Sequence, residues 1–373
     1  MFFFIIIFFF TILVCYSLAS KASFLEYRNM KSARQYATSA IVILFVFLAT
    51  RYDIGRDFQN YLYDYSTFDE SDYGFGRRFS FEYMNYIVLL ICYAFNTGPV
   101  GYFVLTSLIL ALLFYYIFRD KLFLLPYGIV IFFLCGFYTF AINGIRQGLA
   151  IFCIINALTP AKDKDRPDLF HYITYMVIAF FCHNSAMLFV PLYLLFIPGI
   201  SKVFNSKILM LIALAGFIGN QVGFSRFIPV HLFVDTENIY SKQAMNVILD
   251  SNASQLSIAV FINLCVNLIP LFFADKVKNK YPESKVYFVI YTFGIALYYF
   301  FGSNLLLIRL SFYLMYFNIL VYPYLFTYLR QYKKYNQIPI ILNVWYVVYF
   351  LGKMGEFWSM QIGRNPSVYG LSL

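Results

Sequence analysis

The chain has 373 residues, of which 61% are hydrophobic and only 12% are charged, and its formal net charge is +10. Soluble domains carry charge on about a quarter of their residues, so this composition excludes a soluble globular fold. The basic residues stand as pairs and triplets at the ends of apolar segments, which makes them topology signals and not a nucleic-acid-binding surface.

Apolar segments follow one another along the whole chain. They cover about 2–19, 36–50, 81–96, 100–118, 123–142, 144–160, 170–182, 184–200, 207–222, 256–274, 286–302, 304–328 and 336–352. About 20 apolar residues are needed for a helix to cross a bilayer, and lipid forces every backbone group to pair internally. The sequence therefore predicts an all-α, polytopic integral membrane protein with about twelve transmembrane helices in a single domain, 1–373.

The first segment and the cysteines bear on processing and on metal or disulfide chemistry. Residues 1–20 lack the basic start of a cleaved signal peptide, and their apolar run is too long for one, so we expect a retained first span. All six cysteines lie in apolar segments, with no Cys-x-x-Cys and no spacing to histidine that suits a metal. We expect buried, unpaired thiols and no bound metal.

The distribution of basic residues predicts the topology. Eighteen of the 28 lysines and arginines lie in the loops 20–35, 119–121, 161–168, 201–207, 275–285 and 330–334. The positive-inside rule assigns these loops to the cytoplasm, so the long loops 51–80 and 223–255 and the tail 353–373 face outward. One segment between 80 and 119 then cannot cross, and we expect 81–96, which opens with Glu82, to be a re-entrant or interfacial helix.

Four ionisable residues lie within or at the outer ends of spans, where a charge is costly and indicates function. They are Arg51, Arg146, His183 and Arg309. Permanently charged, fork-shaped guanidinium groups suit phosphate or diphosphate, and histidine is the natural base. Arg146 and Arg309 have apolar neighbours on both sides, which favours a functional role over snorkelling to the headgroups.

Structural alternatives remain open for the other candidates. Arg51 has the position of an arginine that snorkels to the lipid headgroups, and a lone histidine such as His183 is often a hydrogen-bonded core residue. A loop ion-pair network without catalytic meaning is the alternative for Asp53, Arg56 and Asp57.

Five short motifs occur in order across roughly residues 35–325. They are Arg51-x-x-x-Gly55-x-Asp57-x-x-x-Tyr61 after a span, Glu82 opening the next segment, Ile145-Arg146-Gln147-Gly148-Leu149-Ala150, His183-x-Ser185, and Arg309-Leu310-Ser311-x-Tyr313. With this set the sequence resembles the EpsG/Wzy family of bacterial polysaccharide polymerases, relatives of O-antigen polymerases and ligases. The outer-loop stretch that begins at Tyr73 departs from the family pattern.

The resemblance implies a bundle like those of GT-C glycosyltransferases and a reaction on the outer face of the bacterial cytoplasmic membrane. It implies transfer of a growing glycan from undecaprenyl diphosphate to the non-reducing end of a lipid-linked repeat unit, with no cofactor and no metal. The expected partners are that lipid-linked oligosaccharide and membrane lipid, with a chain-length regulator protein left open. The implied site residues are His183, Arg146, Arg309 and Asp57 for catalysis, Arg51, Arg146 and Arg309 for diphosphate, and Asp53, Arg56, Gln147 and Asn184 for substrate.

Two other classes of membrane protein compete with this hypothesis. A lipid-linked oligosaccharide flippase also needs about a dozen spans and a cationic cavity, but it should carry charges through both halves and show an internal repeat. Neither feature is visible here. A membrane acyltransferase would use its histidine on a cytoplasmic acyl donor, whereas the predicted topology faces His183 outward.

Overall fold

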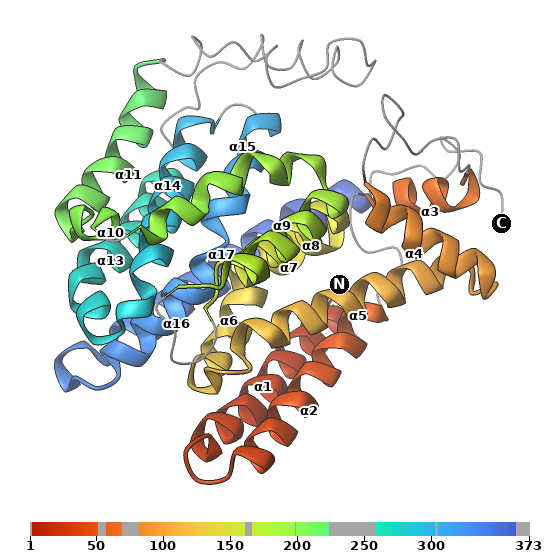
Figure 1. The fold of residues 1–373 in the computed structure, drawn as a ribbon, viewed down its shortest axis with the longest axis horizontal. Helices are drawn as coiled ribbons and strands as arrows, with labels where there is room; N and C mark the ends of the chain where they lie inside the picture. The colour runs from red at the N-terminus through yellow and green to blue at the C-terminus, as the bar shows by residue number, and fades with distance from the viewer. Residues whose placement is uncertain are drawn as a thin grey trace. The chain divides into compact units, whose positions relative to one another are not determined.

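The computed structural model describes residues 2–50, 57–68, 82–160, 166–197, 199–223, 258–302 and 305–362, without side chains at 2–3, 201–202, 305–306 and 353–362. Within these ranges every regular element is a helix, which confirms the all-α class (Figure 1). The predicted outer loops and C-terminal tail lie largely outside the described residues. The chain divides into two compact units, Met1–Met187 with Leu329–Leu373, and Leu188–Tyr328. The single domain expected for 1–373 stays a prediction.

The first unit holds the N-terminal helices and the last one. Its helices are α1 (Phe2–Leu25), α2 (Met30–Ala49), α3 (Phe58–Ser66), α4 (Tyr83–Ala94), α5 (Gly98–Phe118), η2 (Leu122–Leu124), α6 (Leu125–Leu134), α7 (Phe137–Asn143), α8 (Ile145–Ala157), α9 (Leu169–Cys182), η7 (Lys333–Tyr335) and α17 (Ile338–Ile362). The neighbours α1 and α2 pack against each other along their length, as do α8 and α9 (Figure 1).

The second unit begins within η3 (Asn184–Phe196). Its other helices are α10 (Ile200–Val203), α11 (Ser206–Gln221), α13 (Ile258–Lys280), η6 (Pro282–Ser284), α14 (Lys285–Phe300), α15 (Leu305–Met315) and α16 (Asn318–Leu329). Glycines let helix backbones approach here: a Cβ on Gly216 would lie 2.2 Å from the carbonyl oxygen of Ala296. Small residues at helix crossings are typical of packing inside membranes.

Five of the described helices are long and apolar enough to cross a membrane, or six if one bent pair forms a single span. They are Phe4–Leu25, Met30–Ala49, Gly98–Phe118, Ile258–Lys280 and Leu307–Leu329. Five more apolar helices are shorter, among them α4, whose 12 residues extend about 18 Å and fall short of the hydrocarbon thickness. The other four shorter helices have 13 to 16 residues, so length alone does not set α4 apart, and the expectation that 81–96 does not cross stays a prediction. The expected total of about twelve crossings stays a prediction.

The apolar segment 123–142, one of the predicted spans, consists of two helices. Leu122–Leu134 and Phe137–Asn143 meet at 61°. Gly136 joins them with φ of 81°, a left-handed conformation that a residue with a Cβ rarely adopts. One glycine thus redirects the backbone within this predicted span, which the apolar pattern does not show.

In the first unit, polar contacts join the basic loops to one another. The Glu26 carboxylate, between α1 and α2, accepts hydrogen bonds from the backbone N–H groups of Leu122 (3.0 Å) and Phe123 (2.8 Å), just after the basic turn 119–121. Arg330, after α16, donates to the Tyr127 hydroxyl at 2.7 Å. Three predicted cytoplasmic loops of this unit thus lie at the same end of the helices.

The two basic loops of the second unit are joined in the same way. The Ser206 N–H donates to the Asp275 carboxylate, and the Asp275 N–H donates to the Ser206 hydroxyl, both at 2.9 Å. Lys278 donates to the Phe204 carbonyl at 2.6 Å and pairs with Asp275 at 3.0 Å. The loops 201–207 and 275–285 therefore meet, as expected of two loops on one side of a membrane.

The six cysteines are all free thiols, as expected. Five of them are buried, but Cys265 on α13 is exposed, so the expectation that every thiol is buried was wrong there. The reason is that an apolar helix in a membrane protein can present a small apolar residue outward, where lipid replaces protein as its surroundings.

Candidate active site

Three residues that are distant in sequence meet in the first unit. Glu82, immediately before α4, is only 7% exposed. Its Oε2 accepts a hydrogen bond from Arg146 Nη1 at 2.5 Å, and its Oε1 lies 3.6 Å from His183 Nδ1. One buried carboxylate therefore bridges a guanidinium at the start of α8 and an imidazole at the end of α9.

Tyr61 on α3 fixes the start of α8. Its hydroxyl donates to the Asn143 carbonyl and accepts from the Ile145 N–H, both at 2.9 Å, across the break at Gly144 between α7 and α8. Ile145 is the first residue of α8, and Arg146 is the second. Tyr61 thus satisfies backbone groups that a helix break leaves without helical partners. By holding the first residue of α8, it also helps to position the Arg146 side chain.

Aromatic and amide groups surround the arginine. Tyr61 stacks on Tyr102 with ring centroids 5.7 Å apart, and the Tyr102 hydroxyl donates to the Asn85 side-chain oxygen at 2.8 Å. Asp64, one turn further along α3, acts electrostatically on Arg146. A cavity of about 10 Å³ lies between Asn85, Tyr102 and Arg146, with room for about one water molecule.

Burial opposes the charge on Glu82. It raises the pKa of this carboxyl, which lies outside the spanning helices, and the adjacent Arg146 guanidinium acts in the opposite direction. Glu82 is therefore expected to take up a proton at a higher pH than an ordinary glutamate does. Acidification would then weaken the contact with Arg146.

His183 caps the C-terminal end of α9. Its Nδ1 is approached by Glu82 Oε1, by the Ser185 N–H at 3.4 Å and by Ser185 Oγ at 3.3 Å. The ring is half-buried. The histidine can accept a proton, and the carboxylate at Nδ1 can stabilise the imidazolium that results. The arginine beside the carboxylate can stabilise an anion.

Three other predicted residues lie on or next to the helices that carry this site. Gln147 follows Arg146 on α8 but is only 5% exposed, and Asn184 follows His183 and is half-buried. Asp57 precedes α3, and its carboxylate accepts from the Asn60 side chain at 3.3 Å. The substrate roles of Gln147 and Asn184 and the base role of Asp57 stay predictions.

The remaining predicted residues lie in the second unit or outside the described residues. Arg309 lies on α15 in the second unit and is exposed, so its grouping with Arg146 stays a prediction. The others, Arg51, Asp53 and Arg56, lie outside the described residues.

Glu82 is the residue that the site assignment from sequence left out. It was named as the acid that opens an apolar segment and as one of the motifs of the resemblance, but the predicted functional residues did not include it. Its position directly before an apolar helix could have identified Glu82 as a site residue, because a carboxylate that is buried there requires a cationic partner. What sequence could not show is that the two partners come from α8 and α9.

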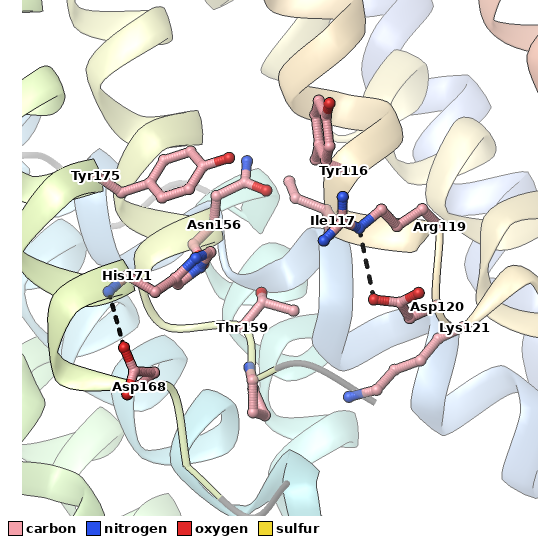
Figure 2. A pocket seen from close by; sticks show the side chains of 11 residues that line it. Tyr116, Ile117, Arg119, Asp120, Lys121, Asn156, Thr159, Asp168, His171 and Tyr175 are labelled. Atoms are coloured by element: carbon pink, nitrogen blue, oxygen red, sulfur yellow. Dashed lines mark hydrogen bonds and ion pairs between the residues drawn. The ribbon is translucent and has the colours of Figure 1, made fainter. Parts of the chain in front are cut away.

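A larger cavity, of about 110 Å³, lies at the other end of the same helices (Figure 2). Figure 2 shows Arg119, Asp120 and Lys121 on one side of it and Asn156, His171 and Tyr175 on the other. Three of its charged side chains have partners in the structure. Arg119 pairs with Asp120 at 3.5 Å and covers the Tyr116 ring, and Asp168 accepts from the backbone at the start of α9.

The two cavities lie at opposite ends of the helices in this unit. Tyr102 and Arg119 stand 17 residues apart on and just after α5, so about 25 Å of helix separates the Arg146 site from the basic cavity. The second cavity lies among the loops 119–121 and 161–168, both rich in lysine and arginine, and it contains none of the predicted site residues. The Glu82, Arg146 and His183 cluster therefore lies at the end away from the basic loops.

Comparison with known proteins identifies a family that matches most of the chain. The sequence model of the EpsG family matches residues 35–362, a range that includes Glu82, Arg146, His183 and Arg309. No curated protein and no solved structure matches the chain significantly. Because the match covers most of the sequence, the chain belongs to the EpsG family.

Proposed function

We propose that this chain is a polysaccharide polymerase of the bacterial cytoplasmic membrane. It transfers a growing glycan from undecaprenyl diphosphate to the non-reducing end of a lipid-linked oligosaccharide repeat unit. Membership in the EpsG family suggests polysaccharide polymerisation as the general activity. The observation that carries the specific proposal is the Glu82 carboxylate between Arg146 and His183, at the end of the bundle away from the basic loops.

The orientation of the site supports reaction on the outer face. In each unit the lysine-rich and arginine-rich loops are held together by polar contacts, and the positive-inside rule assigns that end to the cytoplasm. The Arg146 site is about 25 Å away along α5. Lipid-linked repeat units that have been exported would meet the enzyme at that outer end.

The proposed reaction is a single displacement at the anomeric carbon of the donor. His183 takes the proton from the attacking sugar hydroxyl, and the oxygen forms the new glycosidic bond. The bond from the anomeric carbon to the diphosphate oxygen breaks, and undecaprenyl diphosphate leaves with the electron pair. Arg146 stabilises the charge that grows on this leaving group, and the same role for Arg309 stays a prediction.

The flippase and acyltransferase hypotheses are less well supported. The buried carboxylate between an arginine and a histidine is an arrangement for proton transfer beside an anion, which a flippase does not require. An acyltransferase that takes a cytoplasmic acyl donor would need its histidine near the basic loops, where His171 lies, and not at the end that holds His183.

The test is polymerisation by purified full-length protein in lipid nanodiscs, with lipid-linked repeat units as substrate and a ladder gel as readout. His183→Gln keeps size and hydrogen bonding but cannot act as an efficient base, so turnover should fall by roughly 10² to 10⁴-fold. His171→Gln, in the basic cavity, is the matched control and should leave the ladder nearly unchanged.

Two results would overturn the proposal. One is a normal ladder from His183→Gln at wild-type abundance, because the base would then lie elsewhere. The other concerns a strain that lacks the gene: a lost polymerase leaves single repeat units exported, whereas a complete loss of export would indicate a flippase.

A further inference from the structure

The geometry of Glu82 points to a role for this residue that neither the family match nor the sequence motifs assign. We propose that Glu82 is a positioning residue that holds His183 with its proton on Nδ1, so that Nε2 faces the substrate as the base. The inference rests on the proposed function for its catalytic meaning. Its structural part, the tautomer of His183, can be measured without any turnover.

The first support is where the two carboxylate oxygens point. Oε2 is held by Arg146 Nη1 at 2.5 Å, which orients the carboxylate plane and leaves Oε1 directed toward His183 Nδ1 at 3.6 Å. With Glu82 only 7% exposed, water does not compete strongly for these oxygens. A carboxylate at Nδ1 favours the tautomer that carries the proton on that nitrogen, as carboxylates hydrogen-bonded to metal-bound histidines do.

The second support is that three elements fix this arrangement from different sides. Arg146 is held at the start of α8 by Tyr61, Glu82 stands directly before α4, and His183 ends α9 with its N–H bonded to Ala179. Among the described residues, the other titratable groups that act on this cluster include Asp64 and Tyr61 on α3, Tyr102 on α5, and Cys182 on α9. Asp64 is an acid, and it acts on Arg146.

Ser185 offers the competing arrangement. Its backbone N–H donates a long hydrogen bond to Nδ1 at 3.4 Å, and its hydroxyl oxygen lies 3.3 Å from the same nitrogen. The bond from the N–H requires Nδ1 to accept, which places the proton on Nε2, and in that arrangement His183 could not act as a base through Nε2. The hydroxyl can accept from an Nδ1 proton, so it is compatible with either tautomer. The tautomer therefore decides between the two arrangements.

The positioning role has a consequence during turnover. When Nε2 takes the proton from the sugar hydroxyl, His183 becomes an imidazolium, and the Glu82 carboxylate stabilises that charge. Glutamine at position 82 would keep a similar shape but remove the negative charge. The pKa of His183 should then fall, because the neighbouring anion that favours its protonated form is gone.

The experiment uses full-length protein in nanodiscs and ¹⁵N NMR of the histidine rings. The chain has three histidines, so His171→Gln with His231→Gln leaves His183 as the one ring observed. At neutral pH the wild-type Glu82 background should show the Nδ1–H tautomer, and Glu82→Gln should shift the population toward Nε2–H. An Nε2–H tautomer with Glu82 present would overturn the inference, whatever the enzyme's activity.

The kinetic arm separates positioning from a purely structural role. Glu82→Gln should lower kcat by roughly 10² to 10⁴-fold with a smaller change in KM, and the acid limb of the pH profile should move to lower pH. Glu82→Asp keeps the charge and should recover part of kcat and the wild-type acid limb. Unchanged pH profiles in both variants, with loss that follows protein abundance, would mean that Glu82 only stabilises the fold.

The two arms also separate this inference from the proposed function. If wild-type protein makes no polymer yet shows the Nδ1–H tautomer and its dependence on Glu82, the reaction assignment fails and the positioning role stands. If polymer forms normally but the tautomer does not depend on Glu82, the positioning role fails and the polymerase stands.

Discussion

At the scale of single residues, the site depends on a buried charge that is neutralised by a specific partner. Breaking a buried ion pair by removing one member typically costs several kcal/mol, because the remaining charge is left without compensation. Glu82 and Arg146 therefore cannot be varied independently, and a loss of activity in either variant must be compared with protein abundance. Substitutions that keep the charge are the informative ones.

Arg146→Lys is such a substitution. A lysine keeps the positive charge and can still contact Glu82, but its point charge cannot form two parallel hydrogen bonds to a phosphate. We expect polymer synthesis to fall by roughly 10²-fold while the protein still inserts at normal abundance. Ladder gels beside membrane immunoblots measure both quantities.

Arg119→Lys is the matched control for that variant. Arg119 pairs with Asp120 in the basic cavity, on a half-exposed side chain at the other end of α5. It should retain wild-type activity. Equal loss from Arg119→Lys and Arg146→Lys would indicate a general effect of arginine replacement on the membrane protein.

At the scale of secondary structure, the site depends on helices that begin and end inside the unit. The chain breaks at Gly144, so that α8 starts with Arg146 near its N-terminus, and α9 ends at His183. Free N–H groups at a helix start and the helix dipole both favour an anion there. A continuous span through 137–157 would have left neither feature available.

Tyr61→Phe tests how much the break at Gly144 matters. The variant removes the hydroxyl that bonds both Asn143 and Ile145, leaving a buried N–H without that partner, at a cost of about 1 to 3 kcal/mol. We expect lower thermal stability and, because α8 carries Arg146, a clear loss of activity. Thermal unfolding and the ladder assay measure these two effects.

Tyr63→Phe provides the comparison, since Tyr63 lies on the same short helix and is 56% exposed. Its ring is chemically identical, and its loss of hydroxyl should have little effect on either readout. If both variants behaved alike, the Tyr61 hydroxyl would have no special role at the joint.

At the scale of the whole molecule, polar contacts collect the basic loops within each unit. Glu26 bonds the turn after α5, Arg330 bonds Tyr127, and Asp275 bonds Ser206. Within each unit, these basic loops thus lie together, which is the arrangement that fixes orientation in a bilayer. The proposed outward orientation of the Arg146 site follows from it.

Cysteine labelling tests that orientation. In a Cys265→Ala background, which removes the exposed native thiol, Ser66→Cys on α3 should react with an impermeant maleimide added to intact spheroplasts. Lys31→Cys and Lys333→Cys, both exposed positions in basic loops, should react only after permeabilisation. Labelling of Lys31→Cys from outside would reverse the assigned topology and with it the outward site.

The sequence alone determined the class of protein, because membrane helices need long apolar runs and every backbone bond closes within the helix. It also determined most of the candidate residues, since an arginine or histidine inside an apolar run is costly and stands out as Arg146 and His183 do. The family assignment rested on those same residues in order, and it was confirmed over 35–362.

Only the tertiary structure decided which of these residues meet. The bend at Gly136 and the break at Gly144 depend on backbone conformations that an apolar pattern does not encode, and the pattern predicted only a span over 123–142. Glu82 became part of the site because α4, α8 and α9 bring their ends together, and such contacts depend on packing between segments about 60 and 100 residues apart. Local sequence determines where each helix forms. Whether a buried carboxylate is neutralised depends on tertiary contacts with residues that are distant in sequence.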